Sequence, residues 1–149
     1  MYKKGNYMLL IFSLCMNLNI TTTEYGFCHM AEPYYIDHTV LYFQAERESR
    51  FKAGAVGNYA TASHGLMQLT KSTARNVCGL KGKELYDPYK NLQCAIYYMY
   101  ILLVEYSWDY YTALAAYNQG DTSVNRYGIC SAAGRYASHI LTKAGYELE

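Results

Sequence analysis

Apolar residues recur at helical spacing along most of the chain beyond about residue 32. Between Tyr34 and Arg50 the apolar positions follow this spacing, which predicts an amphipathic helix. From Ala95 to Val104 the chain is apolar on almost every side of a helix, as is typical of a helix in the middle of a bundle. No stretch of strand-like alternation approaches these lengths. The pattern predicts a mainly α domain of about five to seven helices around a central apolar helix.

Polar caps and glycines predict where several of these helices begin and end. Thr70 can cap a helix that runs to about Val77, and Gly79 can end it. Asp87-Pro88 is a stronger start, because Asp accepts hydrogen bonds from the free N–H groups and Pro fits the first helical position. The helix that it opens is expected to reach about Glu105.

Two more helices and one loop complete the predicted domain. Ser107 or Asp109 can cap a helix that Gly120 ends. A last helix is expected over residues 132–144. Residues 53–63 are rich in Gly, Ala, Ser and Asn, which predicts an irregular loop. No repeat and no linker divides the region, so it is expected to form one domain.

The first 28 residues have a different pattern. Lys3 and Lys4 precede an apolar run from Tyr7 to Leu18, and polar residues follow it. This order is typical of a secretory signal peptide, and the run is about half the roughly 20 residues that a membrane-spanning helix needs. We therefore expect a signal peptide at residues 1–28, with an uncleaved membrane anchor as the alternative, and the folded domain at residues 32–149.

The cysteines agree with export. Beyond the apolar run the chain has Cys28, Cys78, Cys94 and Cys130. No C-x-x-C pair occurs, which argues against a zinc or redox-active cysteine site. In an oxidising compartment disulfides are the usual use of such cysteines. One pairing, Cys78 with Cys94, would join two neighbouring helices, and buried free thiols are the alternative.

The net charge and the tyrosine content indicate which classes of ligand the chain is expected to bind. The net charge of +1 provides no basic face, so nucleic acid is not an expected partner. Nineteen tyrosines stand against four phenylalanines. Because Tyr combines a flat apolar face with a hydroxyl, these residues either line a groove that stacks on sugar rings or replace Phe as core filler.

Glu48 is the candidate acid of the chain. It shares one side of its predicted helix with Leu41, Gln44 and Ala45. A carboxyl close to apolar surface loses hydration, which raises its pKa and favours the protonated form that a glycosidase uses to protonate the leaving oxygen. The alternative is a solvated Glu at a helix end, like Glu46, and the helix alone does not decide between them.

Two short segments could complete a sugar site. In Gly65-Leu66-Met67-Gln68 the glycine permits close backbone approach, and the Gln amide offers the donor and the acceptor that suit an N-acetyl group. The segment from Ala113 to Asn118 is a helix of small residues that ends in Tyr and Asn. Each segment also has a structural explanation, because Gln is common near helix starts and small residues allow close helix packing.

These segments belong to an ordered series of motifs. The series closely resembles the catalytic domain of soluble lytic transglycosylases, a family akin to goose-type lysozyme, over roughly residues 34 to 141. Its members are Glu48-Ser49-x-Phe51, Ala55-Val56, Gly65-Leu66-Met67-Gln68-Leu69, Ser72-Thr73-Ala74-Arg75, Asp87-Pro88-x-x-Asn91, Ala113-Leu114-Ala115-Ala116-Tyr117-Asn118-x-Gly120, Val124, and Arg135-Tyr136 followed by Ile140. Their shared order, more than any one motif, supports the resemblance.

The resemblance implies a lysozyme-like α domain with a groove for the glycan strand of peptidoglycan. Glu48 matches the family's catalytic acid and base, and Ser49 matches the Ser that helps to order the site. The resemblance places the other matching positions around the bound sugars or beside the acid, and they are Met67, Gln68, Tyr117, Asn118 and Tyr136. It implies no metal and no cofactor.

Two positions depart from the family pattern, and a third has two interpretations. Lys71 stands where the family often has Pro, and Gln119 replaces the Ala of the Tyr-Asn-Ala-Gly run. His64, in the loop before Gly65, either faces the site or, in the favoured interpretation, lies on the surface.

The reaction that the resemblance implies needs a single carboxylate. Hydrolytic glycosidases usually use two carboxyls, roughly 5 to 9.5 Å apart, and no second acid sits in a family motif here as a partner of Glu48. In a lytic transglycosylase Glu48 would protonate the oxygen that leaves N-acetylmuramic acid, and would then take the proton of that sugar's 6-hydroxyl. The product is a 1,6-anhydro sugar. The alternatives are a goose-type lysozyme that hydrolyses the same bond and a non-catalytic protein of wall binding or assembly.

The expected partner is the glycan strand of peptidoglycan, and the expected location is the periplasm or cell envelope. Secretion from the cell or association with a virion is the alternative location. A secretion, conjugation or phage assembly could use such an enzyme. Contact with a membrane is expected only through an uncleaved N-terminal segment.

Overall fold

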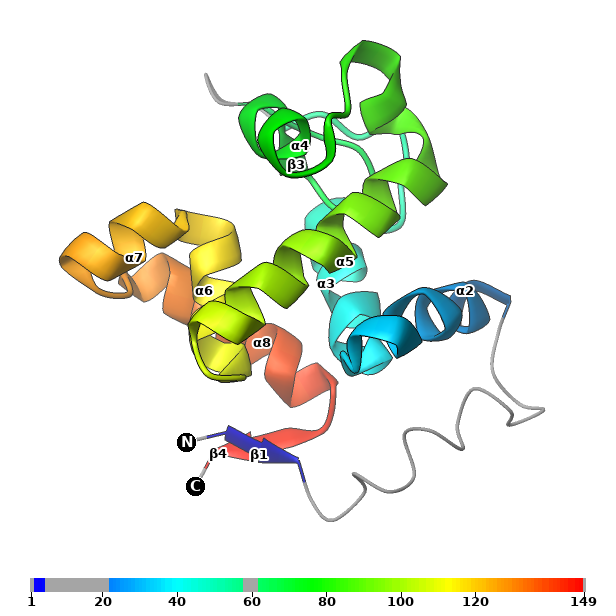
Figure 1. Ribbon diagram of the computed structural model, residues 1–149. Coiled ribbons are helices and arrows are strands. Elements are labelled where there is room, and N and C mark those ends of the chain that lie inside the picture. Colours follow the sequence, from blue (N-terminus) through cyan, green and yellow to red (C-terminus); the bar gives the residue numbers. More distant parts are fainter. Residues whose placement is uncertain (1, 5–21, 58–61, 149) are drawn as a thin grey trace.

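Helix α5, Pro88–Glu105, crosses the middle of the structure, and the other helices pack around it (Figure 1). The computed structural model describes residues 2–4, 22–57 and 62–148. Most of these residues are helical, which confirms the prediction of a mainly α domain.

The other helices of this part of the chain follow one another with short connections. They are α2 (Thr22–Ala31), α3 (His38–Ser49), α4 (Lys71–Cys78), α6 (Tyr110–Gln119), α7 (Asp121–Tyr127) and α8 (Ser131–Lys143), with 3-10 turns η1 (Glu32–Tyr34) and η2 (Gly82–Tyr86). Helices α2, α4 and α6 contact α5, and α8 packs against both α3 and α6. Helix α3 therefore lies next to α8.

Two short antiparallel strand pairs supplement the helices. Strand β2 (Ser63–His64) pairs with β3 (Leu69–Thr70) and encloses a tight turn. Strand β1 (Tyr2–Lys4) pairs with β4 (Tyr146–Leu148) close to the two ends of the chain (Figure 1).

Side-chain caps start three helices at the predicted positions. Thr70, Asp87 and Asp109 each accept a hydrogen bond from a backbone N–H of the following turn, at 3.0, 3.0 and 3.1 Å. Asp109, and not Ser107, is thus the cap of α6. Gly79 ends α4 with φ of +72°, in the left-handed region where Gly is favoured.

Other boundaries differ from the predictions. Helix α3 begins only at His38, because Asp37 caps it by accepting from the Thr39 N–H at 3.0 Å. Tyr35, with φ of +57°, breaks the helical path before it. Helix α7 was not predicted, since it begins at Asp121 and the preceding Gly120 supplies no side-chain cap.

The N-terminal helix α2 contributes to the core. Phe27 and Ala31 are buried in the cluster that α3 also lines, and Cys28 is buried as well, so the packed structure begins before residue 32. The apolar run of residues 7–18 lies outside the described residues, and cleavage of a signal peptide stays a prediction. Within the described ranges, no helix has both the length and the apolarity to cross a membrane.

Helix α5 is central but not buried on every side. Leu102 and Leu103 are fully buried, whereas Val104 is 54% exposed. Tyr97 and Ile101 also reach the surface. The apolar stretch from Ala95 to Val104 therefore overstates the burial of this helix, because one face of α5 is left uncovered by the elements around it.

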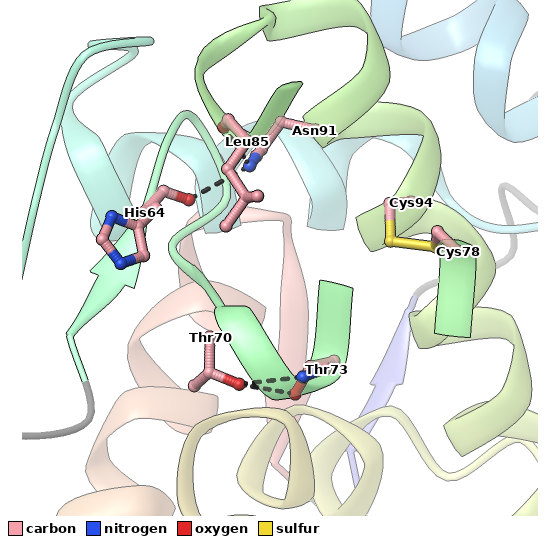
Figure 2. The surroundings of a disulfide bond; sticks show 7 residues. All are labelled: His64, Thr70, Thr73, Cys78, Leu85, Asn91 and Cys94. Carbon is pink, nitrogen blue, oxygen red and sulfur yellow. Dashed lines mark hydrogen bonds between the residues drawn. A yellow bond between two sulfur atoms is a disulfide. The ribbon is translucent and has the colours of Figure 1, made fainter. Parts of the chain in front are cut away.

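A disulfide joins Cys78, the last residue of α4, to Cys94 in α5 (Figure 2). The two Cα atoms are 5.7 Å apart. This confirms the pairing that would link two neighbouring helices. Within the part of the chain that the structure describes, Cys130 is a free and exposed cysteine.

Replacing both Cys78 and Cys94 by Ser should lower the free energy of unfolding by about 3 kcal/mol, because the bond closes a loop between residues 16 positions apart in the unfolded chain. Urea denaturation of the oxidised protein would measure the loss. Cys130→Ser is the matched control and should change stability by less than about 0.5 kcal/mol. Equal stability of the two variants would contradict a stabilising role for the disulfide.

Candidate active site

The turn between β2 and β3 is held by the side chain of Asn91. This residue is fully buried in the first turns of α5. Its Nδ2 donates to the carbonyls of His64 at 3.0 Å and Leu85 at 2.8 Å (Figure 2). Its Oδ1 accepts from the Met67 N–H at 2.8 Å. One amide thus satisfies three buried backbone groups from two separate segments, which ties the turn to α5.

Gly65 is required in this turn for two reasons. Its φ is +79°, a conformation that residues with a Cβ rarely adopt. A Cβ at this position would also collide with the Leu85 carbonyl oxygen and the Asn91 side chain. The close approach of backbone to amide therefore explains the glycine of the Gly65-Leu66-Met67-Gln68 motif.

The side chain of Gln68 completes the turn from inside the loop. Its Nε2 donates to the carbonyls of Gly65 at 2.9 Å and Ala55 at 3.2 Å, and its Oε1 accepts from the Ser63 hydroxyl at 2.7 Å. In this structure the amide thus serves to hold the segment from Ala55 to Gln68 together. Contact with a sugar, which the resemblance implies, stays a prediction for this residue.

Glu48 lies near the end of α3, beside α8. It is partly buried, and its Oε1 accepts a hydrogen bond of 2.5 Å from the Tyr136 hydroxyl. Burial raises the pKa of Glu48 to about 7, while the Tyr136 hydrogen bond and the nearby Arg47 guanidinium act in the opposite direction. Near neutral pH this carboxyl can therefore donate a proton and, after losing it, accept one.

Tyr117 links the same region to the turn. Its hydroxyl donates to the Met67 carbonyl oxygen at 2.9 Å. Burial, and next the charge of Glu48, raises the pKa of Tyr117, and the same two causes raise that of Tyr136. Both phenols are therefore neutral at physiological pH and act as hydrogen-bond donors. Glu48, Tyr117 and Tyr136 are thus brought together from α3, α6 and α8.

The side chains of two other predicted site residues, Met67 and Ser49, contact only the protein itself in this structure. Met67 is fully buried in the core, so its side chain does not line an open groove here, and it takes part through its backbone. Ser49 is buried as well, and its Oγ accepts from the Lys52 N–H at 3.1 Å and donates to the Ala45 carbonyl at 3.4 Å. It closes the chain turn that follows Glu48.

Comparison with known proteins identifies the family. The model of the transglycosylase SLT domain matches residues 27–138. The chain belongs to the transglycosylase SLT domain family. A curated relative, membrane-bound lytic murein transglycosylase C of Haemophilus influenzae, is 33% identical over an alignment that covers 64% of this chain and 30% of the relative. The chain thus matches less than a third of the length of that relative.

Solved structures support the SLT fold. Lytic transglycosylase Slt of Pseudomonas aeruginosa, solved as an inactive mutant, is 17% identical with a TM-score of 0.73, over 93% of this chain and 27% of that one. The 70 kDa soluble lytic transglycosylase of Escherichia coli is 19% identical with a TM-score of 0.57, over 78% of this chain and 22% of that one. Both confirm the expected fold.

His64 and Gln119, two of the positions singled out in this SLT domain, have partners inside the fold. His64 is buried and its Nδ1 lies 2.7 Å from the Tyr86 hydroxyl, so the favoured interpretation of a surface histidine is wrong. Gln119 donates to the Gly128 carbonyl at 2.9 Å and accepts from the Cys130 N–H at 2.8 Å. Gln119 therefore anchors the connection between α7 and α8.

Asn118 and Asn91 lie in opposite environments, one exposed and one fully buried. Asn118 is exposed near the end of α6, and no hydrogen bond among the described residues uses its side chain, so it is available to a ligand. In the sequence, Asn91 stands out only as part of the Asp87-Pro88-x-x-Asn91 motif. Its place one turn after the cap could have marked it as inward-facing, but nothing local predicts its partners.

The SLT domain contains no evident metal site in the part that the structure describes, since no group of three or more His, Cys, Asp or Glu side chains is suitably placed there.

Asn91→Leu should lower the free energy of unfolding of the SLT domain by about 3 kcal/mol or more, because the three backbone groups that the amide satisfies would stay buried without partners. Denaturation in urea would measure the loss. Asn76→Leu, at an exposed position of α4, is the control and should change stability by less than about 0.5 kcal/mol. A similar effect of both substitutions would show that the amide does not hold the turn.

Proposed function

We propose that this SLT domain is a lytic transglycosylase of peptidoglycan. It cleaves the β-1,4 bond between N-acetylmuramic acid and N-acetylglucosamine and forms 1,6-anhydro ends. The observation that supports this function best is the state of Glu48, a partly buried carboxyl with a pKa of about 7 that accepts a hydrogen bond from Tyr136. The membership of the SLT family and the names of its relatives point to the same activity.

The first step of the proposed reaction is protonation of the glycosidic oxygen. Because Tyr136 donates to Oε1 of Glu48, the acidic proton resides on Oε2, which is then free to face the substrate. The bond between the anomeric carbon and the leaving oxygen breaks as that oxygen takes the proton. The N-acetyl oxygen of the same sugar can stabilise the positive charge that develops at the anomeric carbon.

The second step returns the proton to Glu48. The carboxylate accepts it from the 6-hydroxyl of the muramic acid residue, while the 6-oxygen forms a bond to the anomeric carbon. No water is consumed, and the acid is regenerated. The same Tyr136 hydroxyl stabilises the carboxylate between the two steps, since a hydrogen bond to the charged form lowers its energy.

The surroundings of Glu48 support a mechanism with one carboxylate. Among the described residues, the groups that oppose the effect of burial on its pKa are Tyr136 and Arg47, and no carboxylate is among its perturbing neighbours. Glu46, two residues away, is paired with Lys143 at 2.6 Å. A hydrolytic pair of carboxyls would require a second acid within roughly 10 Å and facing the same bond.

For the sugar contacts, we propose direct roles for Asn118 and Gln68. Asn118 is exposed, and its side chain is not engaged in a hydrogen bond within the described residues. Gln68 is only partly buried, and its Oε1 keeps one acceptor position beyond the bond from Ser63. Ser49 and Met67 act instead by shaping the backbone on either side of the site.

We further propose that the protein works in the cell envelope. The Cys78–Cys94 disulfide suits an oxidising compartment, and the first residues have the pattern of an export signal. The Haemophilus influenzae relative is named as membrane-bound. A secretion, conjugation or phage assembly is a context in which such an activity could be used.

Glu48→Gln should lower the rate of release of anhydro-muropeptides from purified peptidoglycan by about 100-fold or more, because the amide can neither donate the acid proton nor take one back. Mass spectrometry of the digest would measure the products. Ends lighter by one water support transglycosylation, and reducing ends alone from the unmutated protein would identify a lysozyme instead. Wall binding without any cleavage would identify a non-catalytic protein.

The same variant should fold at least as well as the unmutated protein. The pKa of Glu48 is raised in the folded state, so its contribution to stability is complete below the unfolded pKa of 4.5 and is lost as the pH rises through about 7. Above pH 7 a neutral Gln avoids burying a charge. Thermal unfolding at pH 8 would compare the two proteins, and a clear loss of stability in the variant would make its inactivity uninformative about catalysis.

Activity should fall as the pH rises through about 7, because the first step requires protonated Glu48. A pH profile of kcat/KM, which reports on the free enzyme, would measure this alkaline limb. Tyr136→Phe removes the hydrogen bond that lowers the Glu48 pKa, so the limb should move to higher pH in that variant. A limb that does not respond to Tyr136→Phe would assign the titration to another group.

A further inference from the structure

Gln44 is a buried polar residue one helical turn before Glu48. Its exposed fraction is 0%, and it shares a face of α3 with the acid because residues four apart lie on the same side of a helix. Both polar atoms of its amide lack a hydrogen-bond partner among the described residues. An amide buried in this way costs free energy on folding, and a Leu or Met of similar size would avoid that cost.

The neighbour of this amide is Tyr136. Burial and the charge of Glu48 raise the pKa of the Tyr136 phenol, and Gln44 acts in the opposite direction. Helix α3 packs against α8, and Gln44 lies one turn before Glu48, which the Tyr136 hydroxyl of α8 contacts. The amide therefore lies near the phenol, although in this structure the contact does not reach the geometry of a hydrogen bond. The phenolic oxygen belongs to the hydroxyl that donates to Glu48 Oε1.

We propose that Gln44 is a positioning residue that acts on Glu48 through Tyr136. When Glu48 is ionised, the Nε2–H group of Gln44 donates to the phenolic oxygen, and this bond directs the phenolic hydrogen toward Glu48 Oε1. The proposal rests on the proposed function, since it assigns Gln44 a part in the acid–base cycle of Glu48.

In this proposal Gln44 donates to Tyr136, and Tyr136 donates to Glu48. A hydroxyl that accepts one hydrogen bond becomes a better donor of its own, so Gln44 strengthens the bond from Tyr136 to the carboxylate. The groups that face or adjoin Glu48 are Tyr136 from α8, Tyr117 from α6, and Arg47 on α3. Gln44 thus helps to keep the carboxylate accessible at neutral pH, which the second step of the cycle needs.

The test is Gln44→Met, which keeps the length of the side chain and removes the amide. The Glu48 pKa should rise by roughly half to one pH unit, as expected for the loss of one neutral hydrogen bond of ordinary strength. Carbon-13 NMR titration of the Glu48 carboxyl would measure it directly. The alkaline limb of activity should move by the same amount, with a lower kcat and an unchanged KM, because Gln44 does not reach the substrate.

Leu41→Met is the matched control. Leu41 is fully buried on the same face of α3 and carries no polar atom, so its replacement by Met should leave the Glu48 pKa unchanged. If Gln44 only fills space, Gln44→Met should leave the Glu48 pKa unchanged, as Leu41→Met does. An unchanged Glu48 pKa in Gln44→Met therefore overturns the proposal.

A double-mutant cycle with Tyr136→Phe tests the route. If Gln44 acts through the phenolic oxygen, Gln44→Met should have no further effect on the Glu48 pKa once that oxygen is absent. An equal shift in both backgrounds overturns the proposed route. The NMR titration needs no substrate, so a failure of this proposal is distinguishable from a failure of the proposed transglycosylase activity.

Discussion

The buried amide of Asn91 is the interaction on which the candidate site depends. It binds the backbone of the turn at His64 and Met67 and that of Leu85 at the same time, and only a glycine at position 65 leaves room for it. The turn held in this way presents the Met67 carbonyl to Tyr117. Tyr117 also lies within the field of Glu48. The hydrogen bonds from Asn91 of α5 to the turn therefore help to determine where the end of α6 lies beside Glu48.

The second constraint is the balance of forces on Glu48. Burial alone would favour a permanently protonated carboxyl, and full solvation would leave it ionised at neutral pH. The Tyr136 hydrogen bond and Arg47 offset part of the effect of burial, and the resulting pKa is about 7. In the proposed mechanism this single group serves as acid and as base in turn, so the second carboxyl of a hydrolytic glycosidase is not needed.

The tyrosines explain how helices distant in the sequence are joined. In the described part of the chain, tyrosine hydroxyls form hydrogen bonds between segments at least 50 residues apart at Tyr110, Tyr117, Tyr136 and Tyr146. Neither sugar stacking nor simple core filling describes this use. Phe would fill the same space but would leave buried polar partners such as the Met67 carbonyl unsatisfied.

The sequence by itself determined the mainly α class, the caps at Thr70, Asp87 and Asp109, and the candidacy of Glu48. Caps are predictable because they join residues two or three positions apart. The raised pKa of Glu48 and the use of Asn91 were decided only by the tertiary structure. Tyr136 lies 88 residues from Glu48, and burial and pairing at such separations depend on how whole helices pack, which no local pattern of residues contains.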